Sequence, residues 1–151
     1  MNTTSHHNTA TLIHLSALSQ YFIPFGNFIF PLIIWSGAKE SSAYVDAQGK
    51  ETINFQLSLF IYSIIMALIA IPVLFILFFK NVKQENFNYH GTFTGHDFNF
   101  ESMTGFIAVA VITVFIFCMM KIAEFFLIIY AAVKTSGGSN FKYPLTIRFL
   151  K

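Results

Sequence analysis

The stretch 53–79, INFQLSLFIYSIIMALIAIPVLFILFF, constrains the fold most, because it runs for 27 residues without a charged side chain. A helix needs about 20 apolar residues to cross the hydrocarbon core of a bilayer. Strands are not this long, and a helix that is apolar on every face has no polar side to turn toward water. The stretch therefore predicts a membrane-spanning helix, which Pro72 should kink in its second half.

The composition agrees with a membrane protein. Of the 151 residues, 55% are hydrophobic and 11% are charged, whereas soluble domains carry about 25% charged residues. A net charge of +2 without a basic stripe argues against a nucleic-acid partner. We expect a polar, disordered N-terminus over 1–11 and a single membrane domain over 12–151, with the lone Cys118 as a small packing residue.

The first apolar segment, 12–35, is long enough to cross a membrane once, at roughly 36 Å if it is wholly helical. Four residues interrupt it: Pro24, Gly26, Asn27 and Pro31. We expect two short halves joined at 23–27, and the sequence does not decide whether they cross the membrane or re-enter it. Broken helices occur in transporters, but kinked packing helices are more common. His14 and Gln20 are expected to be hydrogen-bonded packing or interfacial residues rather than ligands.

The polar stretch 36–52 predicts a short amphipathic helix or helical turn that continues into the central helix. Ser41 or Ser42 can cap this helix, and Asp46 lies in its first turn, where the helix dipole favours a carboxylate. Gly49 is a candidate hinge.

Asp46, Lys50 and Asn54 repeat every four residues and form a stripe along the start of the central helix. Asp46 and Lys50 also stand in the favourable acid-then-base order for an ion pair. Asn54 and Gln56 lie in the first half of the central helix, of which at least one face should pack on protein. We expect the stripe to face protein, such as the tail at 143–151.

The second polar stretch, 81–102, alternates aromatic and polar residues on either side of HGTFTGH. This pattern predicts a short hairpin or an aromatic rim at the membrane interface. His90, His96 and Asp97 are interpreted as exposed loop residues rather than a metal site, and the adjacent pair His6 and His7 lacks the spacing of one. We therefore expect no metal and no cofactor.

The last apolar segment, about 104–133, is interrupted by Lys121 and Glu124, which stand one helical turn apart. A charged residue near the bilayer midplane costs roughly 2.5–3.5 kcal/mol, so both charges must be satisfied. The two can neutralise each other, or lie near water on a shortened, tilted helix. They can also form a proton or ion relay, or a polar seam in a larger complex. The sequence leaves these alternatives open.

The distribution of Lys and Arg predicts the orientation. With three crossings, the first polar loop and the tail share one side and hold six of these residues, and the other side holds Lys80 and Lys83. The expected fold is an all-α membrane protein with about three transmembrane helices and a cytoplasmic C-terminus, in the cytoplasmic (inner) membrane. If segment 12–35 re-enters, the tail stays inside and the N-terminus joins it.

Three motifs carry a resemblance: HLSALSQYFIPFGNFIFPLIIW, then SAYVDAQGKETINFQLSLFIY, then AAVK with FKYPLTIRFLK. In this order they resemble a widespread bacterial family of small integral membrane proteins of unknown function, grouped with the magnetosome proteins MamF and MmsF and once linked to a chloroplast inner-envelope import component. The resemblance covers the chain from Leu12 onward and implies the topology, but no reaction, cofactor or catalytic residue. Gln48 stands where the family pattern commonly has histidine, and neither 81–102 nor the Lys121/Glu124 pair belongs to the pattern.

Three classes of function follow. We expect a non-enzymatic accessory or scaffolding subunit of a cytoplasmic-membrane complex, whose partners are lipid, other membrane subunits or a second copy. The alternative is a small transporter or channel component that uses the broken first helix and the Lys121/Glu124 pair. An enzyme is not expected, because the sequence contains no recognisable catalytic set or phosphate-binding loop. Eight residues are candidates for intramembrane or partner contacts: Lys121, Glu124, Asp46, Lys50, Asn54, Gln56, His14 and Asn27.

Overall fold

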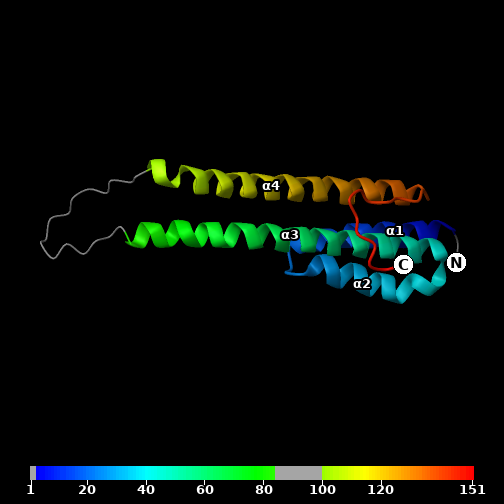
Figure 1. Cartoon of the computed structure of the whole chain (residues 1–151). Coiled ribbons are helices and arrows are strands. Elements are labelled where there is room, and N and C mark those ends of the chain that lie inside the picture. Colours follow the sequence, from blue (N-terminus) through cyan, green and yellow to red (C-terminus); the bar gives the residue numbers. More distant parts are fainter. Residues whose placement is uncertain (1–2, 84–99) are drawn as a thin grey trace, which may run out of the picture. The chain divides into compact units, whose positions relative to one another are not determined.

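The structure is a computed structural model that describes residues 3–83 and 100–151, and all regular secondary structure in these ranges is helical (Figure 1). The elements are α1 (Thr3–Ser16), a 3-10 helix (Ala17–Tyr21), α2 (Gly26–Ala38), a second 3-10 helix (Lys39–Ser41), α3 (Ala43–Lys83) and α4 (Phe100–Ser136). The all-α fold class is therefore confirmed. The hairpin expected within 81–102 falls largely on 84–99, outside the described residues.

Two helices are long and apolar enough to cross a membrane. Their candidate spans are Ala43–Ile76 in α3 and Ile107–Ser136 in α4, and each contains an 18-residue stretch of high mean hydropathy, 2.8 and 2.3. These spans overlap the predicted segments 53–79 and 104–133. Within the described ranges no third helix reaches that length, so three crossings are not confirmed.

The first apolar segment, 12–35, runs through the end of α1, the 3-10 helix Ala17–Tyr21 and most of α2, and so forms the two short halves that the sequence predicts. α1 and α2 pack against each other, and the chain reverses between them (Figure 1). They contain 14 and 13 residues, so each is about 20 Å long. The hydrocarbon core is about 30 Å thick, so neither helix can span it alone.

The reversal between α1 and α2 follows from the residues at 22–26. Phe25 adopts a left-handed backbone conformation with φ of 61°, which ends one helical direction and starts another. Gly26 follows it because a Cβ atom there would lie only 2.6 Å from the Ser19 hydroxyl. The predicted break is therefore present at this point.

The N-terminus differs from our expectation of disorder over 1–11, because α1 begins at Thr3. The hydroxyls of Thr9 and Thr11 donate to the carbonyls one turn earlier, both at 2.9 Å. Ala10 is fully buried. The polar composition of this stretch concealed a helix that is stabilised by packing rather than by an amphipathic pattern.

The start of α3 carries the predicted cap. The backbone N–H of Tyr44 donates to the Ser42 hydroxyl at 3.2 Å, which satisfies one of the unpaired donors of a helix N-terminus. No separate amphipathic helix precedes α3 in this described stretch, because the end of α2, the second 3-10 helix and the first turns of α3 share its residues.

The described contacts divide the chain into two compact units. The terminal unit comprises Met1–Tyr62 and Met120–Lys151, and the second unit comprises Ser63–Met119. Side chains of the second unit are largely exposed: Leu68 is 68% exposed and Phe115 is 65% exposed. Apolar surface of this extent fits a lipid environment.

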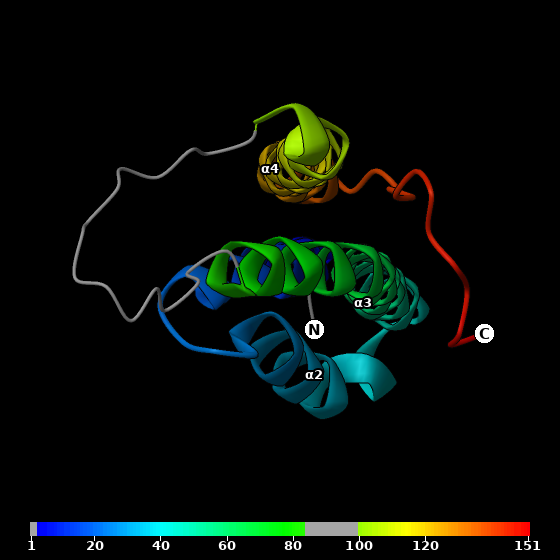
Figure 2. The same cartoon turned by 60° about the vertical axis from the view of Figure 1, so that its left-hand side comes forward.

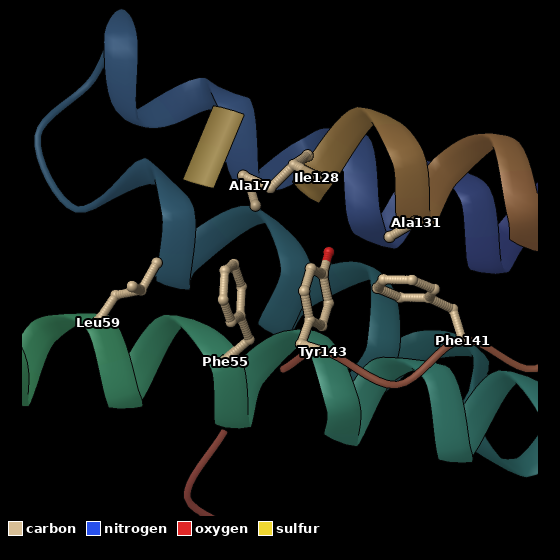
Figure 3. Close-up of a cluster of buried hydrophobic side chains, with 7 residues drawn as sticks. All are labelled: Ala17, Phe55, Leu59, Ile128, Ala131, Phe141 and Tyr143. Carbon is tan, nitrogen blue, oxygen red and sulfur yellow. The ribbon is translucent and has the colours of Figure 1, made fainter. Parts of the chain in front are cut away.

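The core of the terminal unit joins the helices to the C-terminal tail, which follows α4. Seven buried side chains form it (Figure 3): Ala17, Phe55, Leu59, Ile128, Ala131, Phe141 and Tyr143. The rings of Phe55 and Tyr143 stack with centroids 3.9 Å apart and planes inclined by 5°. The tail is thus part of the core and contributes two of its aromatic rings.

Candidate functional site

The C-terminal tail is bound to α3 through hydrogen bonds between its backbone and α3 side chains. After α4 the tail crosses to α3 (Figure 2). The backbone N–H of Tyr143 donates to the Glu51 carboxylate, and that of Ile147 donates to the Ser58 hydroxyl, both at 2.8 Å. Because the tail forms no helix or sheet, its backbone groups need partners of this kind.

Asn54 makes the densest of these contacts. Its side-chain oxygen accepts from the N–H groups of Phe149 and Leu150 at 3.1 and 2.8 Å, and its amide nitrogen donates to the Leu150 carbonyl at 2.9 Å. One turn beyond Ser58, the Tyr62 hydroxyl donates to the Leu145 carbonyl at 2.8 Å. The side chains that bind the tail are spaced by three, four and four residues: Glu51, Asn54, Ser58 and Tyr62. They therefore share one face of α3.

The predicted stripe of Asp46, Lys50 and Asn54 divides at this face. Asn54 contacts the tail, whereas Asp46 and Lys50 form an ion pair of 2.7 Å with both side chains 31% exposed. Asp46 also accepts a hydrogen bond from Trp35 Nε1 at 3.0 Å. Asp46 thus connects α3 to α2 rather than to the tail.

His14 of α1 lies at the centre of a fully buried polar cluster. Its Nδ1 lies 2.9 Å from the hydroxyls of both Tyr143 and Thr52. The Thr52 hydroxyl donates to the Gln48 carbonyl at 2.9 Å, so its oxygen can accept the Nδ1 hydrogen of His14. The imidazole therefore links α1, α3 and the tail.

Gln48 completes this cluster. With its amide oriented so that both atoms find partners, the nitrogen donates to His14 Nε2 at 3.1 Å and to the Phe141 carbonyl at 3.3 Å. The amide oxygen accepts from the Phe141 N–H at 3.3 Å. This network assigns a neutral imidazole that carries its hydrogen on Nδ1.

Burial controls the ionisation of the cluster. His14 lies in α1, outside both candidate spans, and burial lowers its pKa from 6.5 to about 4. Burial, followed by the charges of Glu51 and Glu124, raises the pKa of Tyr143 well above its usual value of 10. Both groups are therefore neutral at physiological pH.

Lys121 and Glu124 form a second cluster, together with Gln20. Lys121 Nζ lies 2.8 Å from the Glu124 carboxylate, whose side chain is fully buried. The Gln20 amide nitrogen donates to the other carboxylate oxygen at 2.8 Å, and its amide oxygen accepts from Lys121 at 3.4 Å. Of the alternatives left open by the sequence, the structure contains the internal pair, with Gln20 as an additional partner.

Asn27 and Gln56 form a third contact, between α2 and α3. The Asn27 amide nitrogen donates to the Gln56 side-chain oxygen at 2.8 Å. Gln56 is fully buried, and its own amide nitrogen has no hydrogen-bond partner among the described residues. The candidates of segment 12–35 and of α3 are thus brought together in the terminal unit.

The described residues contain no group of three or more His, Cys, Asp or Glu side chains able to hold a metal ion. His7 packs its ring against Tyr44, with centroids 5.3 Å apart. His90, His96 and Asp97 lie outside the described residues. Within the described residues, the polar clusters connect α1, α2, α3, α4 and the tail.

Several members of these clusters were not among the eight candidate contacts named from the sequence: Gln48, Glu51, Thr52, Ser58 and Tyr143. A signal did exist, because Gln48, Thr52 and Phe55 follow each other at helical spacing and share a face. Their partners are 34 to 129 residues away in the chain. Local patterns cannot predict such pairings.

Comparison with known proteins gives one match. No curated protein and no solved structure matches the chain. Residues 5–150 match the family described as the magnetosome magnetite crystal formation protein family, MamF/MmsF. This range includes all three polar clusters and both candidate spans. Because the match covers nearly the whole chain, the protein belongs to the MamF/MmsF family of magnetosome membrane proteins.

Proposed function

We propose that this protein is a non-enzymatic accessory or scaffolding subunit of a complex in the cytoplasmic membrane, with its C-terminus in the cytoplasm. One observation carries the proposal: the buried polar side chains of the terminal unit bond one another and the tail, while large apolar side chains cover the outside. Such a protein offers surfaces for lipid and for other membrane helices.

The outer surface of α4 supports this role. Within the terminal unit, Phe126 is 64% exposed and Val133 is 65% exposed. In the second unit, Val111 and Phe115 are exposed to a similar degree. Apolar faces of this kind allow helices of neighbouring subunits to pack, since association in membranes depends on van der Waals contact.

The family description names magnetite crystal formation in the magnetosome. For this chain we propose the part of such a role that a small membrane subunit can perform, which is to build or organise a membrane assembly. The proposal assigns no catalytic residue and no cofactor to the chain.

A transporter component is the second candidate, and one observation favours it. An open apolar pocket lies beside the Lys121–Glu124 pair and is lined by Tyr21, Lys121, Ile122, Phe125 and Phe126. Ionisable residues at membrane depth often mark ion paths. The bond of Gln20 to both charges favours a structural role instead.

Copurification in mild detergent tests the proposal. We expect a stoichiometric membrane partner or a defined oligomer of the chain, and no ion flux when the purified protein is placed in liposomes. The double variant Lys121→Met/Glu124→Gln serves as the control. A monomer that conducts ions, and loses conduction in this folded double variant, would establish the transporter role and refute the scaffold.

A further inference from the structure

We propose that the α1–α2 hairpin enters the membrane from the side of both chain termini, reaches only the acyl chains of that leaflet, and returns. The chain then crosses the membrane twice, through α3 and α4. This inference concerns the surface of the hairpin and does not depend on the proposed function.

The base of the hairpin, in α1, contacts the start of α3 and the end of α4. The Thr11 hydroxyl lies 3.4 Å from that of Thr135, near the end of α4. His7 contacts the Tyr44 ring at the start of α3, and a Cβ atom on Gly138 would lie 2.5 Å from the His7 ring. The N-terminus, the start of α3 and the end of α4 therefore lie at the same end of the terminal unit.

The tip of the hairpin lies deeper along the same helices. The rings of Tyr21 and Phe125 lie 6.1 Å apart, and those of Phe28 and Phe60 lie 5.8 Å apart. From Val133 to the level of Lys121, which bonds Gln20, α4 rises by about 18 Å. This rise is shorter than the hydrocarbon core, which is about 30 Å thick, so the hairpin is too short to reach the opposite face.

The tip exposes large apolar side chains. Phe22 is 88% exposed, Phe25 is 64% exposed and Ile23 is 46% exposed. The outer face of α2 continues this surface with Ile29, Phe30, Leu32 and Ile33. Segment 12–35 contains no Lys, Arg, Asp or Glu, and its polar side chains His14, Gln20 and Asn27 bond within the protein.

Acyl chains are the occupant that fits this surface. It is continuous with the exposed apolar side chains of α4, since Tyr21 contacts Phe125 and Phe125 contacts Phe126. Phe125 and Phe126 belong to the candidate membrane span of α4. The hairpin and the span therefore present one apolar surface.

Three N–H groups of the turn have the internal partner that a polar group needs in a membrane interior. The N–H groups of Phe22 and Ile23 donate to the Ser19 carbonyl at 3.0 and 2.9 Å, and that of Gly26 donates to the Ile23 carbonyl at 3.0 Å. Pro24 has no N–H to satisfy. The turn can thus be placed among acyl chains without exposing these donors.

Cysteine labelling tests the sidedness. Single cysteines are introduced in a Cys118→Ser background as Thr4→Cys, Ser139→Cys and Gly91→Cys, and are exposed to a membrane-impermeant maleimide from either face of membrane vesicles. Thr4→Cys and Ser139→Cys should be labelled from one face, and Gly91→Cys from the other. Labelling of Thr4→Cys and Ser139→Cys from opposite faces would show that the segment crosses, and would overturn the proposal.

The depth of the tip is measured separately with a fluorophore on Phe22→Cys, in bilayers whose lipids carry a quencher at different positions along the acyl chain. Quenching should be strongest for quenchers deep in the chain, whereas the control Ser36→Cys, at the end of α2, should respond to quenchers near the headgroup. Rapid reaction of Phe22→Cys with the impermeant reagent would place the tip in water and overturn the proposal. Disulfide-linked dimers of Phe22→Cys without lipid quenching would place a second copy there and also overturn it.

Discussion

Glu124 is 1% exposed, and its carboxylate is held by Lys121 and by Gln20 from a different part of the chain. A buried charge is stable only while its partners remain, and removing one of them costs more than the pair contributes. Residues of this kind therefore report on the fold through single and double substitutions.

Lys121→Met should lower the free energy of unfolding by about 3 kcal/mol, because Glu124 would remain charged without its main partner. The double variant Lys121→Met/Glu124→Gln should return close to the wild-type value, since Gln20 can bond a neutral amide. Thermal unfolding in detergent measures both. Lys134→Met, at an exposed position of the same helix, is the matched control. If the wild type and the three variants have the same free energy of unfolding, the Lys121–Glu124 pair does not stabilise the fold.

His14 predicts a pH dependence. Its pKa is about 4 when folded and 6.5 when unfolded, so between these values only the unfolded chain binds the proton. The contribution of His14 to the free energy of unfolding is therefore fully present above pH 6.5 and is lost as the pH falls toward 4. Between pH 7 and pH 5 the free energy of unfolding should decrease by about 2 kcal/mol. Unfolding curves of the wild type and of His14→Gln at both values check this. The same slope in both proteins would assign the effect to other groups.

At the scale of the elements, two faces of α3 have different partners. One face binds the tail through Asn54 and its neighbours, and another lies against α2. Gly49, which the sequence suggested as a hinge, lies where Trp35 of α2 packs on α3, because a Cβ atom there would lie 2.0 Å from the Trp35 ring. Close packing of two helices explains this glycine, and no hinge is needed.

Asn54→Ala should release the tail, because it removes three hydrogen bonds and leaves backbone groups of Phe149 and Leu150 without partners. We expect a loss of about 3 kcal/mol and faster proteolysis of the C-terminus. Lys50→Ala, which removes only a partly exposed ion pair, should cost about 0.5 kcal/mol. Limited proteolysis of both variants measures how firmly the tail is bound. An unchanged cleavage rate for Asn54→Ala would show that Asn54 does not hold the tail.

Gly49→Ala should destabilise the protein even though alanine favours a helix by about 1 kcal/mol over glycine. The added methyl group must displace the Trp35 ring. Gly37→Ala is the control, since a Cβ atom there would meet nothing within 4 Å outside its own helix backbone and chain neighbours, and it should stabilise. Trp35 is the single tryptophan of the chain, so its fluorescence reports the displacement directly. An unchanged spectrum in Gly49→Ala would contradict the packing.

The sequence predicted the elements that depend on local pattern and missed those that depend on distant contacts. The two long apolar runs, the break near Gly26 and the Asp46–Lys50 pair follow from composition and spacing. Whether 12–35 crosses or reverses does not, because the two arrangements share the same residues and differ only in what Tyr21 and Phe28 contact. The binding of the tail is equally hidden, since its backbone bonds to side chains and leaves no periodic pattern.

At the scale of the whole molecule, the charge distribution and the contacts of the terminal unit lead to the same topology. The N-terminal part of α1, the start of α3 and the end of α4 gather at one end of this unit, and the C-terminal tail begins there. Six of the nine Lys and Arg residues belong to the first polar loop, the end of α4 and the tail. Because positively charged segments remain on the cytoplasmic side, we expect the N-terminus and the C-terminus to be cytoplasmic together.

Reporter fusions test this orientation. A reporter after Lys151 and one before Met1 should both read cytoplasmic, and one inserted near Gly91 should read extracytoplasmic. Lys142, Arg148 and Lys151 are exposed, so Gln at all three should leave the fold intact but weaken the charge difference, giving a mixed population of orientations. Gln at Lys80 and Lys83 removes charge from the opposite side and should keep one orientation. If the triple variant stays uniformly oriented while the double variant becomes mixed, the positive charges of the tail do not set the topology. The packing of the terminal unit must then do so instead.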